Sequence, residues 1–178
     1  MARLVSFRDA ALGYGHTPAL TGLTLDVFGG QALALVGPNG GGKTTLMRGI
    51  AGGCSLLSGS VEVEAERIGL VPQSADLDLT FPVSAAEVVT MGLVTEVGWG
   101  RRITADKRAR VGAALERVNL SDRASHRFGT LSGGQRQRVS IARALLKQAQ
   151  IYLFDDCLSA VDTDTEEKIL HNLSQTAQ

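Results

Sequence analysis

The chain has 178 residues, of which 44% are hydrophobic and 20% charged, a balance typical of one globular domain with a sizeable core. Lysine plus arginine and aspartate plus glutamate number 18 each, so the charge gives no indication of a nucleic-acid or membrane-surface partner. No apolar run reaches the roughly 18 residues of a membrane span, and the first residues lack the pattern of a signal peptide.

The first elements in the chain are predicted strands. Residues 3–9 alternate between apolar and polar side chains, as a half-buried strand does, and residues 20–28 alternate again. Residues 12–15, which lie between them, predict a turn that carries the aromatic ring of Tyr14. Residues 59–64 have the pattern of a further strand. We expect these strands to form a small antiparallel sheet.

A glycine-rich loop follows the second predicted strand. The apolar run 32–36 predicts a third strand, residues 37–45 read G-P-N-G-G-G-K-T-T, and a helical pattern comes next. This order and spacing are those of a phosphate-binding loop, in which glycines let backbone N–H groups approach an anion at the helix start. An ordinary glycine-rich turn is the alternative, which the flanking strand and helix disfavour. The candidate nucleotide-binding residues are Gly37, Pro38, Asn39, Gly40, Gly41, Gly42, Lys43, Thr44 and Thr45.

Two residues of this loop have side chains suited to particular partners. Lys43 would reach the β- and γ-phosphate oxygens of a nucleotide with its positive charge. The hydroxyl of Thr44 is placed to bind Mg²⁺.

The middle of the chain has a helical pattern. Residues 68–71 predict a short strand, after which residues 74–130 change in character. Ser84 and Glu87 fit a capping box, and Thr104 precedes an amphipathic helical pattern. We interpret residues 74–130 as a helical lobe inserted into an α/β core.

Another glycine-containing helix start follows this lobe. Ser132 and Gln135 can form a capping box, while Gly133 and Gly134 leave the first N–H groups bare for an anion. An ordinary capped helix would explain the serine and the glutamine but not the paired glycines. Residues 151–154 then predict a buried strand that ends at two aspartates, where ligands of open α/β sheets bind. These aspartates are Asp155 and Asp156.

The phosphate loop, the later L-S-G-G-Q helix start and the apolar strand that ends in Asp155 together resemble the ATP-binding subunit of ABC transporters. The resemblance covers essentially the whole chain. It implies a P-loop NTPase (RecA-like) α/β core, formed by residues 1–73 and 131–178, with a small antiparallel β-subdomain. Residues 74–130 would be the inserted helical subdomain.

The resemblance also implies roles for particular residues, with ATP and Mg²⁺ as ligands. Tyr14 would stack on adenine, and Asp155 would hold Mg²⁺ together with Thr44. Gln73 would contact Mg²⁺ and the attacking water. Residues 132–135 would contact the γ-phosphate of ATP held by a second subunit.

The resemblance is incomplete near the end of the sequence. In the family, the catalytic glutamate directly follows the Walker B aspartate, the Mg²⁺ ligand to which Asp155 corresponds. This chain has Asp156 at the glutamate position, and its shorter side chain draws the carboxylate back by about 1.5 Å. Because a general base must lie close to the proton that it removes, we expect weak hydrolysis of ATP. The other catalytic candidates are Gln73 and Lys43. Residues 1–150 resemble zinc- and manganese-type importer ATPases, whereas residues 151–173 resemble exporter-type domains. The sequence stops before the family's switch histidine, so a truncated or chimeric chain is also expected.

The interpretation is therefore an ATP-binding and weakly ATP-hydrolysing subunit that powers transport, with a divalent metal ion as the candidate substrate. Its partners would be a second ATP-binding subunit in a homo- or heterodimer and an integral membrane permease, with no nucleic acid and no direct membrane insertion. Two distant cysteines without a C-x-x-C pattern indicate a reducing compartment, in line with a cytoplasmic protein bound to the inner membrane face through the permease. A non-transport ABC ATPase and an inactive fragment that binds nucleotide poorly are the alternatives.

Overall fold

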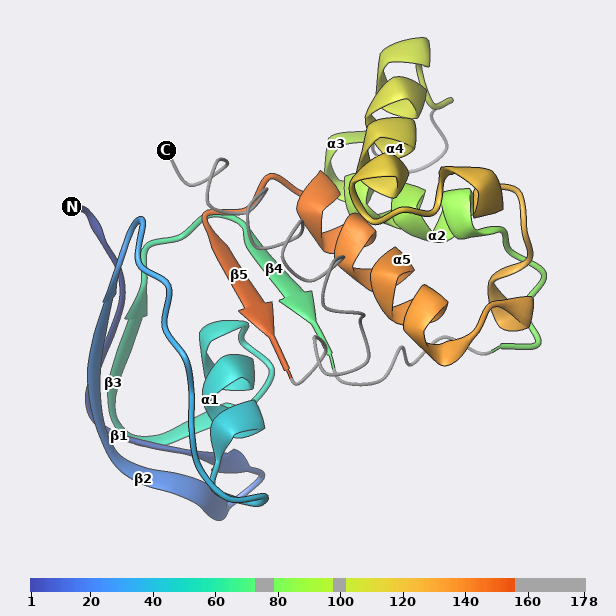
Figure 1. The fold of residues 1–178 in the computed structure, drawn as a ribbon. Helices are drawn as coiled ribbons and strands as arrows, with labels where there is room; N and C mark the ends of the chain where they lie inside the picture. Colours follow the sequence, from blue (N-terminus) through green and yellow to red (C-terminus); the bar gives the residue numbers. More distant parts are fainter. Residues whose placement is uncertain (73–78, 98–101, 156–178) are drawn as a thin grey trace. The chain divides into compact units, whose positions relative to one another are not determined.

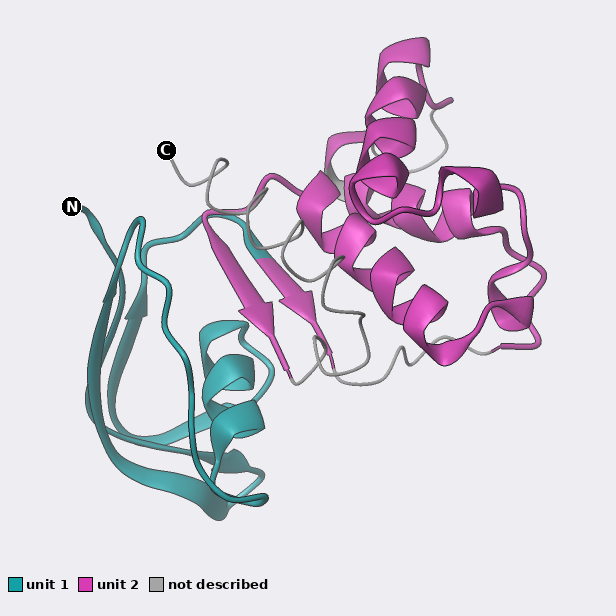
Figure 2. Cartoon of the chain, viewed as in Figure 1, with its two compact units in different colours: residues 1–68, 177 teal, residues 69–176, 178 magenta. Residues whose placement is uncertain are grey.

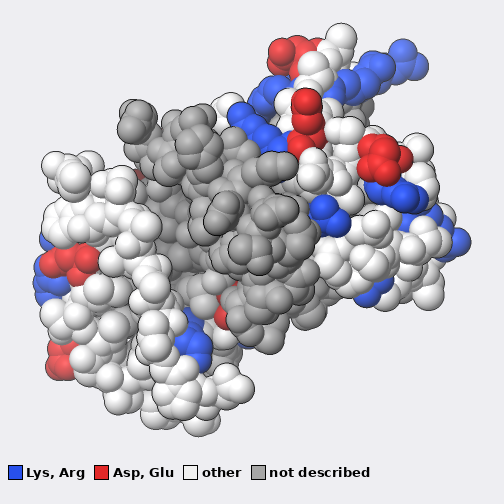
Figure 3. Space-filling view, in the orientation of Figure 1, with Lys and Arg blue, Asp and Glu red and all other residues white. Residues whose placement is uncertain are grey.

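The computed structural model describes residues 1–72, 79–97 and 102–155. The chain divides into two compact units, one from Met1 to Ile68 and one from Gly69 onward (Figure 2). Among the described residues, no helix combines the length and the apolar character that crossing a membrane would need. On the face shown in Figure 3, basic and acidic side chains are interspersed rather than gathered in one patch.

Unit 1 is built on a three-stranded antiparallel sheet with the order β2-β1-β3 (Figure 1). Its strands are β1 (Arg3–Tyr14), β2 (Thr17–Phe28) and β3 (Ser55–Val63). The central strand β1 supplies most of the buried face, with Val5, Phe7 and Leu12 almost fully covered. The predicted small antiparallel sheet is therefore confirmed, although its strands are longer than the sequence pattern indicated.

The turn predicted for residues 12–15 is partly wrong. Leu12 to Tyr14 continue β1, and only Gly15 and His16 connect β1 to β2. The reason is the close packing around Gly13, because a Cβ at this position would collide with the backbone carbonyl of Thr17. This glycine thus allows two strands to approach closely instead of making a turn.

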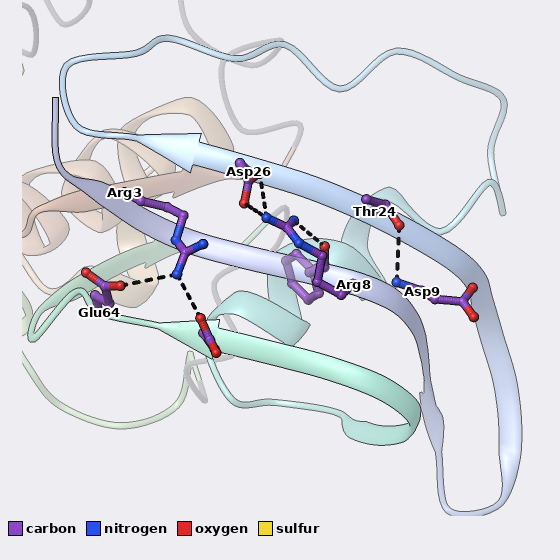
Figure 4. Close-up of polar contacts among 8 residues, drawn as sticks. Arg3, Arg8, Asp9, Thr24, Asp26 and Glu64 are labelled. Carbon is purple, nitrogen blue, oxygen red and sulfur yellow. Dashed lines mark hydrogen bonds and ion pairs between the residues drawn. The ribbon is translucent and has the colours of Figure 1, made fainter.

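The outer surface of the sheet carries polar contacts between strands (Figure 4). Arg8 on β1 donates from Nη2 to both carboxylate oxygens of Asp26 on β2, at 2.9 and 2.8 Å. Arg3 pairs with Glu62 on β3 at 2.9 Å and with Glu64 at 3.7 Å. These ion pairs join the central strand to both of its neighbours.

Helix α1 (Lys43–Ile50) packs on this sheet and contacts all three strands. Its buried residues are Thr45, Leu46, Met47 and Ile50. Gly49 lies so close to Leu12 of β1 that a Cβ there would stand 2.6 Å from the leucine Cδ1. The sheet therefore fixes the helix that begins directly after the glycine-rich loop.

The strand predicted for residues 32–36 is wrong. This segment has no regular secondary structure, and Leu33, Leu35 and Val36 are 55%, 40% and 94% exposed. A strand exists only where a neighbouring strand takes its backbone hydrogen bonds. No backbone hydrogen bond joins residues 32–36 to another described residue. The apolar run satisfied the side-chain pattern, which carries no information about the partner strand.

Unit 2 combines a two-stranded sheet with a group of helices. Strands β4 (Ile68–Val71) and β5 (Ile151–Phe154) pair and run in the same direction (Figure 1). The strands expected at residues 68–71 and 151–154 are therefore confirmed. The helices are α2 (Ala85–Thr90), η1 (Met91–Leu93), α3 (Val94–Val97), α4 (Ala105–Arg117), η2 (Ser121–Arg123), η3 (Phe128–Thr130) and α5 (Gly133–Leu146).

Helix α5 is the centre of this unit, since it contacts α2, α4 and η1. The shared core includes Val89, Leu115, Phe128 and Ile141, with Tyr152 of β5 packed against it. The capping box of Ser84 and Glu87 and the helix start at Thr104 are both confirmed. The division into residues 1–73 with 131–178 and an inserted lobe 74–130 stays a prediction.

Candidate functional site

The glycine-rich loop before α1 has a backbone suited to an anion. Gly40 and Gly42 have φ angles of 81° and 83°, in the left-handed region that favours glycine. A Cβ at Gly40 would meet no atom within 4 Å, so the loop is open on that side. Gly42 is the N-cap of α1, no side chain caps the helix, and its first turn has no acidic residue. The first N–H groups of α1 can therefore face an anion.

Lys43, the first residue of α1, places its charge in the same loop. Its Nζ donates to the carbonyl oxygens of Gly37 and Pro38, each at 2.8 Å. An ammonium group has three N–H donors, and these two bonds use two of them. The loop backbone thus holds the positive charge beside its own N–H groups, an arrangement that can bind phosphate.

The two threonines that follow differ in their surroundings. Thr44 is half-buried in the first turn of α1, whereas Thr45 is 7% exposed and part of the core. The carbonyl of Thr45 accepts a contact from the Cys54 Sγ at 3.6 Å. Burial raises the pKa of the half-buried Cys54 thiol, which disfavours its thiolate form.

Tyr14 lies at the end of β1 in the same unit as the phosphate loop. Its side chain is 44% exposed. Nη1 of Arg48, on α1, donates to the Tyr14 hydroxyl at 3.3 Å, and the Arg48 Cζ lies 5.9 Å from the ring centroid. The sequence analysis did not identify Arg48, because 34 residues separate the two and helical periodicity marks only an exposed basic position.

The start of α5 has the second expected anion-binding geometry. Ser132 accepts from the Gln135 N–H at 3.2 Å, and the Gln135 side chain accepts from the Ser132 N–H at 2.9 Å, which confirms the capping box. This box leaves the N–H groups of Gly133 and Gly134 without an acceptor among the described residues. Ser132 and Gly133 are exposed, and the first turn of α5 has no acidic side chain.

Asp155 directly follows β5, as the sequence predicts. Its backbone N–H donates to the carbonyl of Val71, the last residue of β4, at 3.0 Å. Gln137 of α5 donates from Nε2 to the carbonyl of Pro72 at 3.3 Å, a contact that the sequence analysis missed. The only sequence signal for it is a glutamine on the buried face of a helix.

The candidate site residues lie in both units, and some of them lie outside the described residues. Tyr14 and residues 37–45 belong to unit 1, whereas residues 132–135 and Asp155 belong to unit 2. Gln73, Asp156 and the exporter-like run after Asp155 lie outside the described residues.

The side chains fit a nucleotide phosphate and Mg²⁺ in chemical type. Magnesium in nucleotide sites takes one or two protein oxygens and completes its shell with phosphate and water. Thr44 and Asp155 are oxygen ligands of that kind. Within the described ranges no three His, Cys, Asp or Glu residues cluster as a metal site by themselves. Thr44 in unit 1 and Asp155 in unit 2 each carry an oxygen donor of the kind that a phosphate-bound magnesium ion takes.

Comparison with known proteins gives consistent matches. The sequence model of the family described as ABC transporter matches residues 20–159. The zinc transport system ATP-binding protein TroB of Treponema pallidum is 36% identical over 176 residues, which cover 95% of this chain and 66% of that protein. The manganese transport system ATP-binding protein MntB of Bacillus subtilis is 35% identical over 178 residues, 96% of this chain and 71% of that protein. The chain thus spans about two thirds of the length of these relatives.

Solved structures show the same fold. One, described as an inward-facing metal-chelate type ABC transporter, superimposes with a TM-score of 0.82 at 32% identity and covers 100% of this chain and 69% of its own. An ATP-binding cassette dimer in a post-hydrolysis state with ADP and Pi gives a TM-score of 0.84 at 28% identity, covering 98% and 83%. The mixed α/β architecture, with its phosphate loop and antiparallel sheet, is therefore that of a P-loop NTPase domain.

Proposed function

The chain belongs to the ABC transporter family of ATP-binding domains, and we propose that it hydrolyses ATP to power movement of a divalent metal ion through a separate membrane permease. The observation that carries the ATP part is the loop of residues 37–42, whose left-handed glycines and Lys43 form a cradle for phosphate. The names of TroB and MntB, which specify zinc and manganese, support the metal part.

The proposed role of residues from both units is to bind and orient the nucleotide. The loop N–H groups and Lys43 bind the β- and γ-phosphates, and the N-terminus of α1 adds its favourable dipole. Tyr14 orients the base by stacking on its ring. Thr44 and Asp155 hold Mg²⁺, which would neutralise charge on the phosphate oxygens.

The catalytic step is assigned to Lys43 and to two residues beyond the described ranges, Gln73 and Asp156. Asp156 would accept the proton of the attacking water, and Gln73 would orient that water, while Lys43 stabilises charge that develops on the γ-phosphate. An aspartate at the base position supports a slow reaction, because its carboxylate reaches about 1.5 Å less far than that of glutamate.

Partners follow from the second anion-binding helix start. Residues 132–135 are assigned to the γ-phosphate of ATP held by a second ATP-binding subunit, so the active form is a dimer. Residues 74–130 form the helical subdomain, and residues 1–73 with 131–178 form the nucleotide-binding core. The dimer attaches to the cytoplasmic side of a permease.

Two measurements test the two parts of this proposal. The first is phosphate release from ATP by the purified chain, alone and with its permease, which should require Mg²⁺ and be lost in Lys43→Ala. The second is accumulation of radioactive zinc and manganese by cells with and without the gene. Unchanged uptake of both ions in the deletion strain would reject the metal assignment, whereas a chain that neither binds nor hydrolyses ATP would reject the whole.

A further inference from the structure

Arg48 contacts the exposed ring of Tyr14 and lies in the last turn of α1, outside the phosphate loop. We propose that Arg48 is a positioning residue, which holds the Tyr14 ring in the orientation that stacks on the base of a bound nucleotide. The inference rests on the proposed function, since it presupposes that the chain binds ATP and that Tyr14 contacts the base.

The geometry gives Arg48 two contacts with one ring. Its Nη1 donates to the hydroxyl at 3.3 Å, and its Cζ lies 5.9 Å from the centroid, within the about 6 Å over which a guanidinium attracts an aromatic face. Both contacts place the guanidinium at the hydroxyl end of the ring, where they fix the far end of the tyrosine side chain. The orientation of the ring plane is thereby held from its hydroxyl end, which leaves its faces for contact with a flat base.

Tyr14 needs such support because of its place in the chain. It is the last residue of β1, and the two-residue turn of Gly15 and His16 follows it. Its neighbours on both sides are glycines, Gly13 and Gly15, which offer no side chain to pack against the ring. With 44% of its surface exposed, the ring has few core contacts to select one rotamer.

Helix α1 links this contact to the phosphate loop. The helix has eight residues, with Lys43 at its start and Arg48 in its last turn. One rigid element therefore carries the charge that binds phosphate and the side chain that holds the ring. Because loss of the Arg48 side chain leaves Lys43 in place, it should weaken binding of the base while leaving binding of the phosphate chain unchanged.

The test compares two probes on the full chain by titration calorimetry: Mg-ATP, which has a base, and magnesium tripolyphosphate, which has none. Arg48→Met should weaken Mg-ATP binding by about two- to tenfold, the range that ordering one side chain on binding covers, with tripolyphosphate binding unchanged. Arg48→Lys keeps a cation beside the ring and should retain part of the affinity. Arg117→Met, which removes the same charge from an exposed position of α4, is the matched control and should change neither.

A double-mutant cycle makes the result specific to the ring. In a Tyr14→Ala background, Arg48→Met should have no further effect on Mg-ATP affinity. Tyr14→Phe, which loses the hydroxyl contact but keeps the ring, should weaken Mg-ATP binding and leave tripolyphosphate binding unchanged. This variant tests the proposal even if Arg48→Met does not fold.

Several results would overturn the inference. Equal losses for both probes would place Arg48 at the phosphates, and tighter Mg-ATP binding in Arg48→Met would mean that the arginine obstructs the base. Unchanged Mg-ATP affinity in Arg48→Met or in Tyr14→Phe would remove the positioning role. A wild-type chain that binds neither probe would instead contradict the proposed function itself.

Discussion

The side-chain amide of Gln137 donates a hydrogen bond to the carbonyl oxygen of Pro72 at 3.3 Å, although 65 residues separate the two in the chain. Gln137 is 5% exposed and lies two residues after Gln135 in α5. Pro72 directly precedes Gln73. The bond therefore ties the helix whose start we assign to a γ-phosphate to the point where the chain leaves β4.

Replacing Gln137 by methionine should lower the free energy of unfolding. Methionine fills a similar volume but cannot donate, and an intramolecular hydrogen bond contributes about 0.5–1.5 kcal/mol, more where the remaining partner is buried. Urea denaturation would measure the loss, with Lys147→Met, at an exposed position just after α5, as the control. If both variants unfold at the same urea concentration, the bond adds nothing to stability.

Gly59 should not tolerate even alanine. Its φ is 74°, and a Cβ would collide with the carbonyls of Arg8 and Asp9, where the β1–β3 register shifts. The left-handed conformation costs a non-glycine residue about 1–2 kcal/mol, and the collision adds backbone strain. Gly22 is the matched control, since its φ is 67° but no atom lies within 4 Å of its Cβ position. Gly59→Ala should lose clearly more stability than Gly22→Ala in urea, and equal losses would show that the collision relaxes freely.

Local patterns predicted local structure well. The capping boxes of Ser132 with Gln135 and Ser84 with Glu87, and the helix start at Thr104, depend only on residues within one turn, so the sequence contains all the information. The run 32–36 failed because a strand depends on a partner elsewhere. Likewise, the contact of Arg48 with Tyr14 depends on how α1 packs on the sheet, which no periodicity reveals.

The ion pair of Arg8 and Asp26 should make stability depend on pH. The hydrogen bonds from the Arg8 side chain, with a smaller contribution from Ser6, hold the pKa of the Asp26 carboxyl below its usual value of 3.8. A depressed folded-state pKa contributes stability that is fully present above the unfolded pKa and is lost as pH falls through the folded pKa. Asp26→Asn should therefore destabilise the chain at pH 7, and this effect should shrink as pH falls below the unfolded value and disappear only below the lowered folded-state pKa.

A double-mutant cycle of Arg8→Met and Asp26→Asn would isolate that coupling. Both side chains are partly exposed, so added salt should reduce the coupling at neutral pH. Thermal unfolding at low and high ionic strength gives the values. A coupling that persists unchanged into acid would assign the effect to packing of the two side chains, not to charge.

Mg-ATP should stabilise the folded chain through Lys43. At about 100 times Kd, a ligand that binds only the native state adds roughly 2.7 kcal/mol, which appears as a rise in Tm. Lys43→Ala removes the ammonium that the carbonyls of Gly37 and Pro38 hold in the loop, and should abolish most of the rise. Lys147→Ala, at an exposed position, is the control. An equal Tm shift in all three proteins would mean that Lys43 is not at the phosphates.

The last prediction concerns the length of one side chain, at Asp156. If this residue occupies the position of the base, Asp156→Glu should raise the rate of ATP hydrolysis, because the longer side chain brings the carboxylate about 1.5 Å nearer the attacking water. The gain should reach an order of magnitude or more, since misplacement by about 1 Å can cost on the order of 10²-fold.

Asp155→Asn should act differently: it removes a charge that holds Mg²⁺ and should raise the magnesium concentration needed for half-maximal binding of ATP. Asp122→Glu, the same lengthening at an exposed carboxylate, should leave both quantities unchanged. Steady-state phosphate release and a magnesium titration of ATP binding separate the two roles, and a rate in Asp156→Glu equal to that of wild type would show that the shortened carboxylate does not limit hydrolysis.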